Sequence, residues 1–194
     1  NIYLMALLAG LAIPFAGIFL RDMLNDTVQE LREVEKGTAT PILGEIGHNE
    51  SGNMLVITQE SRSSSAELFR LLRANLQFAA GGKENKVILV TSSMSGEGKT
   101  FFSLNLAASL VMTGKRVVVL GFDLRKPKLT QGVNLPNNIG ITNYLISDTV
   151  QIEDLIQFAP EMPELAIIGS GPIPPNPAEL MLLPKIGLLL DELK

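Results

Sequence analysis

The sequence predicts an α/β protein in which one transmembrane helix precedes a doubly wound, mostly parallel sheet, carried only in part by this chain. Three observations support this prediction. An apolar run without charged residues occupies positions 2–20. Two apolar runs of strand length, 87–90 and 117–120, each lead into a polar loop. The segment between them has the composition of an apolar helix, and strand, helix, strand is the order of a parallel sheet.

Composition excludes several functional classes. The 194 residues include no cysteine, one histidine and no tryptophan. A disulfide scaffold, a thiol nucleophile, a zinc-thiolate centre and a multi-histidine metal site are therefore excluded. The net charge of −4 at pH 7 and the aromatic content of 5% argue against a nucleic-acid-binding protein, which needs basic residues and stacking rings.

The first apolar run is predicted to cross a membrane. A helix over residues 2–20 would be roughly 28 Å long, close to the hydrocarbon thickness of a bilayer. The alternatives are the core of a signal peptide and a buried helix of a soluble protein. Three basic residues, Arg21, Arg32 and Lys36, follow the run. Positive charge marks the cytoplasmic flank, so we expect the rest of the chain to lie in the cytoplasm.

Composition divides the remainder into two parts. Residues 21–53 are predicted to form a juxtamembrane segment and linker, and residues 54–194 the N-terminal part of a larger domain. Within the first part, residues 21–36 are charged and have helical spacing of their apolar positions, and Gly37 is expected to end that helix.

A further helix, predicted from Ser64 to about Gln77, carries a regular charge pattern. Ser64 is expected to be its N-cap and Glu67 to complete a capping box. Glu67, Arg70 and Arg73 recur every three residues, which places them on one broad face. Two interpretations are open. The face is either a solvated stripe with local ion pairs or a subunit interface where Glu67 meets an arginine of a neighbouring subunit.

A phosphate-binding loop is predicted directly after the apolar run 87–90. Strand, glycine-rich loop, Gly-Lys-Thr and helix follow in the order of a P-loop, and the alternative is a chance glycine-rich turn. Lys99 is expected to reach the β and γ phosphates, and Thr100 to offer its hydroxyl to Mg²⁺. Gly96 and Gly98 let backbone N–H groups turn towards phosphate oxygens. The expected nucleotide-binding residues are Ser93, Met94, Ser95, Gly96, Glu97, Gly98, Lys99, Thr100 and Phe101.

Asp123 is the candidate acidic residue of the site. It follows the predicted buried strand 117–120. Because the carboxyl ends of parallel strands share one edge of the sheet, Asp123 is expected beside the phosphate-binding loop. There it would hold Mg²⁺ or accept a proton from an attacking hydroxyl. The alternative is an aspartate that caps a turn.

Taken together, these motifs resemble those of the bacterial tyrosine kinases (BY-kinases), the cytoplasmic part of capsular and exopolysaccharide chain-length co-polymerases. Residues 67–73 match the family's E-x-x-R-x-x-R oligomerisation motif, and residues 93–100 match its Walker A motif. Residues 121–127 are similar to its Walker A′ motif, and residues 169–180 resemble the loop that precedes Walker B. By the same resemblance, residues 2–20 look like the family's second transmembrane helix.

Two departures from the family pattern are visible. Gly121 stands where Walker A′ has its first acid, which predicts weaker Mg²⁺ organisation. The Walker B strand is expected after this chain, because residues 185–194 fit a helix better, although Asp191 and Glu192 follow three leucines. The chain by itself is therefore expected to be inactive.

The absence of the Walker B strand from this chain is also expected to destabilise the larger domain. Residues 40–194 expressed alone should fold poorly or aggregate, because the edge of an apolar sheet would stay unpaired. Circular dichroism and light scattering would check this expectation, and a cooperative melt of a monomer would contradict it.

The resemblance implies a membrane-anchored, ATP-dependent protein-tyrosine autokinase that regulates capsular or exopolysaccharide synthesis and export. ATP and Mg²⁺ would be the cofactors, Lys99 and Asp123 the catalytic residues, and Thr100 and Asp123 the metal ligands. The implied location is the bacterial inner membrane, with the kinase domain in the cytoplasm.

Implied partners are further copies of the chain, in a ring formed through Glu67, Arg70 and Arg73, and the polysaccharide polymerase and export machinery. No nucleic acid is implied. The alternative function is a catalytically weak, ATP-gated assembly module that sets polysaccharide chain length without kinase activity. A soluble partitioning or septum-positioning ATPase is disfavoured, because Met94 stands where those proteins carry a signature lysine.

Overall fold

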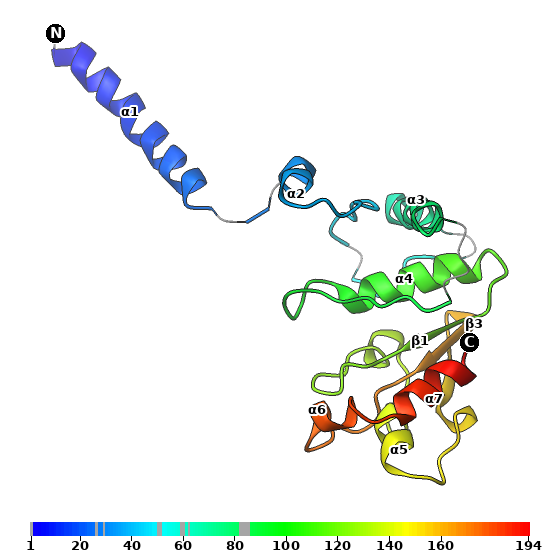
Figure 1. Cartoon of the computed structure of the whole chain (residues 1–194). Coiled ribbons are helices and arrows are strands. Elements are labelled where there is room, and N and C mark those ends of the chain that lie inside the picture. The colour runs from blue at the N-terminus through cyan, green and yellow to red at the C-terminus, as the bar shows by residue number, and fades with distance from the viewer. Residues whose placement is uncertain are drawn as a thin grey trace. The chain divides into compact units, whose positions relative to one another are not determined.

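The structure divides the chain into two compact units, Asn1–Ile42 and Leu43–Lys194 (Figure 1). It is a computed structural model, and it describes residues 2–25, 27–28, 30–49, 52–58, 61, 63–81 and 86–194. The boundary lies inside the segment that the sequence assigns to the linker.

The first unit consists of two helices. Helix α1, Ile2–Met23, has no buried residue and a mean hydropathy of 2.2, so its length and composition suit a membrane span. It continues one turn beyond the predicted end at residue 20. Helix α2, Leu31–Gly37, ends at the predicted glycine. The charged helix expected over residues 21–36 is thus divided, since Leu24 and Asn25 are already non-helical.

A mixed three-stranded sheet forms the centre of the second unit. Strand β1 is Val117–Leu120, β2 is Ile156–Ala159 and β3 is Met162–Ile168, in the order β1-β3-β2. Strands β1 and β3 are parallel, with Val117 opposite Leu165, whereas β2 is antiparallel to β3. The predicted strand 117–120 is confirmed. The sheet as described is mixed rather than mostly parallel.

Helices cover both faces of this sheet. Helix α3, Ser64–Ala79, packs on α4, Lys99–Val111, and α4 packs on β1 and β3, so that α4 lies between α3 and the sheet (Figure 1). The other helical elements of the unit are η1 Gln131–Val133, α5 Ile141–Ile146, η2 Glu153–Leu155, α6 Pro177–Leu180 and α7 Lys185–Glu192. Helix α7 confirms that residues 185–194 do not form a Walker B strand.

Alternation along β1 explains the two layers. Val117 and Val119 pack in an apolar cluster with α3 and α4, whereas Val118 and Leu120 pack in a second cluster with α5 and α7. Successive side chains of a strand point to opposite faces. Four consecutive apolar residues therefore serve two cores, as expected of a strand buried on both faces.

The prediction of a buried strand over residues 87–90 is wrong for this structure. Residues 86–90 form no ladder with any described strand, and Val87, Ile88 and Leu89 are 49%, 45% and 87% exposed. A strand requires a partner whose N–H and C=O groups complete its hydrogen bonds. Among the described residues, β1 has β3 on one edge and no strand on the other, so nothing holds residues 86–90 in the sheet.

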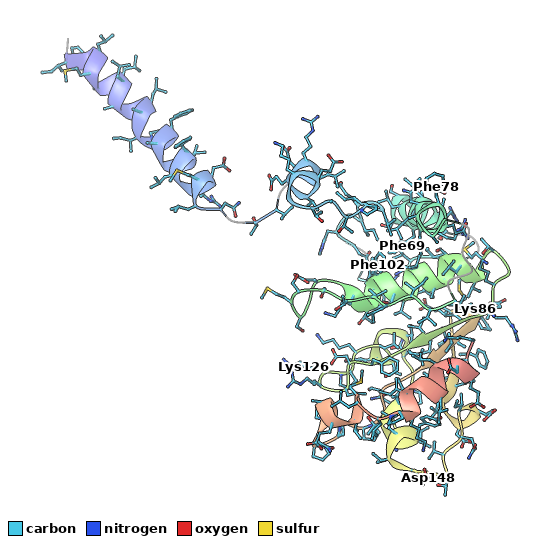
Figure 2. The ribbon with its side chains drawn as sticks, in the orientation of Figure 1. Phe69, Phe78, Lys86, Phe102, Lys126 and Asp148 are labelled. Carbon is cyan, nitrogen blue, oxygen red and sulfur yellow. The ribbon has the colours of Figure 1, made fainter. Side chains whose placement is uncertain are left out.

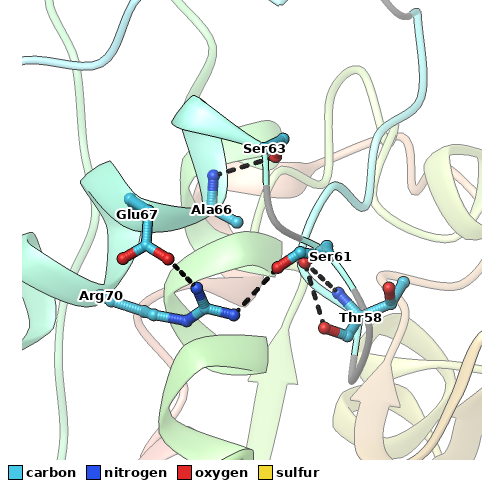
Figure 3. A network of polar contacts seen from close by, with 6 residues as sticks. All are labelled: Thr58, Ser61, Ser63, Ala66, Glu67 and Arg70. Carbon is cyan, nitrogen blue, oxygen red and sulfur yellow. Dashed lines mark hydrogen bonds and ion pairs between the residues drawn. The ribbon is translucent and has the colours of Figure 1, made fainter.

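The start of α3 also differs from the prediction by one residue. The N-cap is Ser63, whose hydroxyl accepts the N–H of Ala66 at 3.2 Å, rather than Ser64 (Figure 3). Glu67 therefore lies one position too late for a capping box, and its carboxylate pairs with Arg70 instead. The helix ends at Ala79 rather than at about Gln77, and Gly81, with a φ of +61°, follows two residues later.

Candidate functional site

The loop before α4 has the backbone of an anion-binding cradle. Gly96 and Gly98 have φ values of +95° and +86°, in the left-handed region that favours glycine. Gly98 is the N-cap of α4, and that helix of 13 residues directs its first N–H groups at the loop. A Cβ added at either glycine would meet no atom within 4 Å. Glycine is therefore favoured at both positions by the backbone conformation and not by a close neighbour.

Lys99 provides the positive charge of this cradle. Its Nζ donates to the hydroxyl of Ser92 at 2.8 Å and to the carbonyl of Met94 at 3.1 Å. Both acceptors are neutral, and none of the ion pairs between described residues involves Lys99. The ammonium group is therefore fixed across the loop while its charge remains available to an anion.

Glu97 makes a hydrogen bond within the phosphate loop. Its Oε2 accepts the backbone N–H of Met94 at 3.0 Å. This hydrogen bond, with help from Ser92 and the charge of Lys99, holds the pKa of the Glu97 carboxyl below its ordinary value. The anionic side chain thus engages an N–H group that a phosphate would otherwise use. The sequence indicates Glu97 only as a member of the loop and not as its internal anion.

The remaining loop residues differ in what they offer a ligand. Ser93, Met94 and Ser95 are exposed, and Thr100 is half-buried. The centroid of the Phe101 ring lies 5.7 Å from that of Phe69 on α3, so this side chain packs against the apolar core. Phe102 contacts the same Phe69 ring at 6.0 Å (Figure 2). Both aromatic contacts fix the first turn of α4.

Asp123 lies at the carboxyl end of β1, on the same side of the sheet as the phosphate loop. The chain runs down α4 and returns along β1, so the N-terminus of α4 and the end of β1 share one edge. Asp123 is exposed, and its Oδ1 accepts the backbone N–H groups of Arg125 at 3.2 Å and Lys126 at 3.0 Å. One carboxylate oxygen therefore stabilises a turn, and Oδ2 makes no hydrogen bond with the described residues.

The missing acid at position 121 is accommodated by local packing. Gly121 N–H donates to Ile168 O at 2.9 Å and so extends the β1–β3 pairing by one residue. A Cβ at this position would lie 3.2 Å from the Leu129 side chain and 3.4 Å from the Ser170 nitrogen. A larger residue would require Leu129 to shift.

The loop after β3 lies at the same edge of the sheet and is tightly held. Asn137 donates to Gly171 O at 2.7 Å and accepts from Gly171 N–H at 3.0 Å. A Cβ on Gly140 would lie 2.2 Å from the Gly171 nitrogen, so only glycine permits this backbone approach. The sequence singles out residues 169–180 by resemblance, whereas Asn137 carries no sequence signal of its own.

The three charged residues predicted on α3 make different contacts within this chain. Glu67 and Arg70 form an ion pair, and Arg70 Nη2 also donates to Ser61 O at 3.1 Å (Figure 3). Arg73 instead donates to Ser109 O on α4 at 2.5 Å. The structure therefore shows the local ion pair of the first interpretation and adds an internal contact that the spacing did not indicate.

Asn105 is a structural residue of the site that sequence reasoning missed. It lies in α4 with 0% exposure. Its Oδ1 accepts the N–H groups of Val56 at 2.8 Å and Ile57 at 3.2 Å, and its Nδ2 donates to Met54 O and Phe101 O, each at 2.8 Å. The available signal was a lone amide in an otherwise apolar helix, because buried amides are hydrogen-bonded.

Comparison with known proteins is consistent with this geometry. Residues 88–162 match the family model described as CobQ/CobB/MinD/ParA nucleotide binding domain. The chain is 37% identical over 129 residues to tyrosine-protein kinase YwqD of Bacillus subtilis (strain 168), a match covering 66% of this chain and 53% of that protein. The chain thus spans about half the length of this relative.

Two solved structures share the fold. The chimerical protein CapA2B2 is 31% identical, with a TM-score of 0.72 over 84% of this chain and 70% of that one. The kinase domain of the Escherichia coli tyrosine kinase ETK is 25% identical, with a TM-score of 0.75 over 86% and 69%. Because motif order, P-loop geometry, sequence similarity and fold agree, this chain belongs to the bacterial tyrosine kinase family.

Proposed function

We propose that this chain supplies the nucleotide-binding part of a membrane-anchored, ATP-dependent protein-tyrosine kinase that acts in capsular or exopolysaccharide synthesis. The observation that carries the proposal is the cradle formed by Gly96, Gly98 and Lys99 at the start of α4, with an ammonium group that forms no ion pair among the described residues. The similar protein YwqD is a tyrosine-protein kinase.

In this proposal the loop binds the triphosphate of ATP. The N–H groups at the start of α4 surround the phosphate oxygens, and Lys99 leaves Ser92 and Met94 to contact the β and γ phosphates. Met94 N–H becomes available when Glu97 releases it. When ATP binds, hydrogen bonds within the loop are replaced by hydrogen bonds to the phosphates. Few N–H donors of the loop therefore have to give up bound water.

The residues present fit a magnesium ion. No group of three or more His, Cys, Asp or Glu side chains among the described residues could form an all-protein metal centre. Mg²⁺ needs none, because it is held by one or two protein oxygens together with water and phosphates. The Thr100 hydroxyl would hold it directly, and Oδ2 of Asp123 would hold it through one of its waters and so stay able to accept a proton. When bound, the ion neutralises charge on the transferring phosphoryl group.

Asp123 is the proposed proton acceptor. A tyrosine oxygen forms a bond to the γ phosphorus, the bond between that phosphorus and the β–γ bridging oxygen breaks, and ADP leaves. The proton of the tyrosine hydroxyl passes to Oδ2 of Asp123, while Oδ1 keeps the turn in place. Tyr144 is 7% exposed and Tyr3 lies in α1, so the proposed acceptor is a tyrosine other than these two.

Membrane attachment and assembly complete the proposal. Helix α1 would anchor the protein in the bacterial inner membrane with the kinase domain in the cytoplasm. Copies of the chain would assemble in a ring through the α3 face that carries Glu67, Arg70 and Arg73, and the ring would present one subunit's tyrosine to the next subunit's site. The polysaccharide polymerase and export machinery would be its partner.

Gly121 favours a second candidate function. With a single acid at the end of β1, nucleotide binding could serve only to switch assembly, without phosphoryl transfer. The first candidate function forms phosphotyrosine and the second does not, so this product distinguishes them.

Asp123→Asn tests the proposed catalytic role. The amide keeps Oδ1 as an acceptor for the turn but cannot take a proton. We expect about a hundredfold slower phosphotyrosine formation in the full-length natural protein with an added tyrosine peptide, and an ATP dissociation constant changed by less than about threefold. Phosphotyrosine is measured by mass spectrometry.

Asp154→Asn is the matched control, because Asp154 also caps a turn, through a 3.0 Å bond to Gln151 N–H, but precedes β2, which β3 separates from β1. It should leave the rate unchanged. Equal rates for the Asp123 variant and the unsubstituted protein would refute the role of Asp123. ATP binding that changes only the assembly state would select the second candidate.

A further inference from the structure

The loop after β3 presents an exposed apolar side chain. Ile173 is 63% exposed, and it lies between Pro172 and Pro174 in a segment, 172–175, that has three prolines. Proline has a fixed φ and no N–H group, so this segment offers apolar surface in one backbone conformation. Pro174 is buried, which holds the middle of the segment against the rest of the unit. Ile173 is therefore the exposed apolar side chain of a preorganised loop.

The base of this loop is fixed by hydrogen bonds. Asn137 contacts both backbone groups of Gly171, donating to its O at 2.7 Å and accepting from its N–H at 3.0 Å. Gly171 has a φ of +79°, a conformation that favours glycine. The N–H of Ile141, at the start of α5, donates to Gly169 O at 2.9 Å. A loop held in this way loses little conformational entropy when it binds a ligand.

The same loop adjoins the turn that carries Asp123. Gly121 N–H donates to Ile168 O, so the two loops leave paired ends of β1 and β3. Leu124, the residue after Asp123, packs in one apolar cluster with Leu180, at the end of α6. The loop before α4, the loop after β1 and α6 lie towards one edge of the sheet (Figure 1). An acceptor that reaches Asp123 therefore approaches at the edge where the proline-rich loop lies.

Three exposed basic residues follow Asp123, and none forms an ion pair with the described residues. They are Arg125, Lys126 and Lys128. The backbone N–H of Lys126 donates to Asp123 Oδ1 at 3.0 Å, and Figure 2 shows the Lys126 side chain at this edge. Residues 169–180 contribute one acid, Glu179. The protein has a net charge of −4, so the positive charge here is local, and it complements an acidic ligand.

We infer that these two loops receive the acceptor tyrosine and select acidic residues around it. Ile173 contacts the tyrosine ring, and Lys126 and Lys128 contact carboxylates at neighbouring positions of the acceptor. The occupant is a protein segment that carries a tyrosine among acidic residues. This inference rests on the proposed kinase function and specifies the substrate class of that site.

The test measures phosphorylation of two synthetic peptides by the full-length natural protein in detergent. In one peptide a single tyrosine is flanked by glutamates, and in the other glutamines replace those glutamates. The variants are Ile173→Ser, Ile173→Leu and the double replacement Lys126→Gln with Lys128→Gln. For each, kcat and KM for both peptides, the dissociation constant for ATP and the melting temperature are measured.

Two exposed residues elsewhere supply matched controls. Ile146→Ser is the control for Ile173→Ser, because Ile146 is 66% exposed and ends α5, whereas the start of α5 contacts the proline-rich loop. Lys115→Gln is the control for the lysine replacements, because Lys115 is exposed in the turn after α4. Both controls should keep the values of the unsubstituted protein.

We expect Ile173→Ser to raise KM for both peptides about tenfold, with an ATP dissociation constant within about twofold of the original. Ile173→Leu should recover most of the loss. The unsubstituted protein should prefer the glutamate peptide about tenfold in kcat/KM, and the double lysine variant should reduce this preference to about twofold.

Several results would overturn the inference. They are an unchanged KM in Ile173→Ser, an equal rise of KM in Ile146→Ser, equal kcat/KM of the unsubstituted protein for the two peptides, and a preference for glutamate that survives the double lysine replacement. Should Ile173→Ser not fold, the two peptides and the lysine variant decide the question. Absence of phosphotyrosine with the unsubstituted protein and either peptide would overturn the proposed function and this inference together.

Discussion

Replacing Lys99 by methionine should raise the dissociation constant for ATP by about a hundredfold or more, because it removes the cation that the phosphate loop positions. In the structure Lys99 contacts two neutral acceptors, so its loss leaves no buried charge unpaired. Methionine retains the length and the apolar stem of the side chain. The expected loss is therefore one of binding and transfer, with little change in stability. Isothermal titration calorimetry with ATP and Mg²⁺ measures it.

Lys115→Met is the matched control for this prediction. Lys115 is exposed in the turn after α4, at the end of the helix far from the phosphate loop. It removes the same charge from the protein while leaving the loop intact, so ATP affinity should stay within about twofold of the unsubstituted protein. Equal losses in the two variants would mean that net charge, not the loop, determines binding.

Asn105→Leu should lower the free energy of unfolding by about 4 kcal/mol, the largest stability effect we expect in this chain. Leucine has a similar volume but leaves Met54 O, Val56 N–H and Ile57 N–H without their partner inside the core. Each buried backbone group without a hydrogen bond costs about 1–3 kcal/mol. Chemical denaturation followed by circular dichroism measures the change.

Asn75→Leu is the control for that prediction. Asn75 makes one bond, from Nδ2 to Leu43 O at 2.7 Å, in a partly buried position. Its loss should cost about 1 kcal/mol, because water can replace the bond. Similar losses for the two variants would contradict the view that the hydrogen bonds of Asn105 hold residues 54–57 against α4.

The features that sequence predicted well depend on local chemistry. Gly96 and Gly98 have the left-handed φ values that a phosphate loop needs, and α4 begins directly after them at Lys99, because neighbouring residues determine both features. Four apolar residues at 117–120 suit only a strand buried on both faces. Helix α7 is predicted from the charged residues on either side of an apolar run.

The features that sequence predicted poorly depend on partners far along the chain. Residues 87–90 have strand composition, but pairing is a non-local property that their sequence does not contain. Ser63 and Ser64 offer the same hydroxyl, so composition does not choose the N-cap. The partners of Asn105 lie about 50 positions earlier in the chain, and the partner of Arg73 lies 36 positions later. The spacing of residues within one helix predicts neither of these contacts.

The central claim is that the phosphate loop serves transfer of a phosphoryl group to tyrosine. The most direct measurement incubates the full-length natural protein in lipid vesicles with Mg²⁺, γ-labelled ATP and a synthetic glutamate–tyrosine copolymer, alongside Lys99→Met and Lys115→Met. We predict labelled phosphotyrosine with the unsubstituted protein and Lys115→Met, and none with Lys99→Met. ATP binding that depends on Lys99 without any labelled phosphotyrosine would contradict the account.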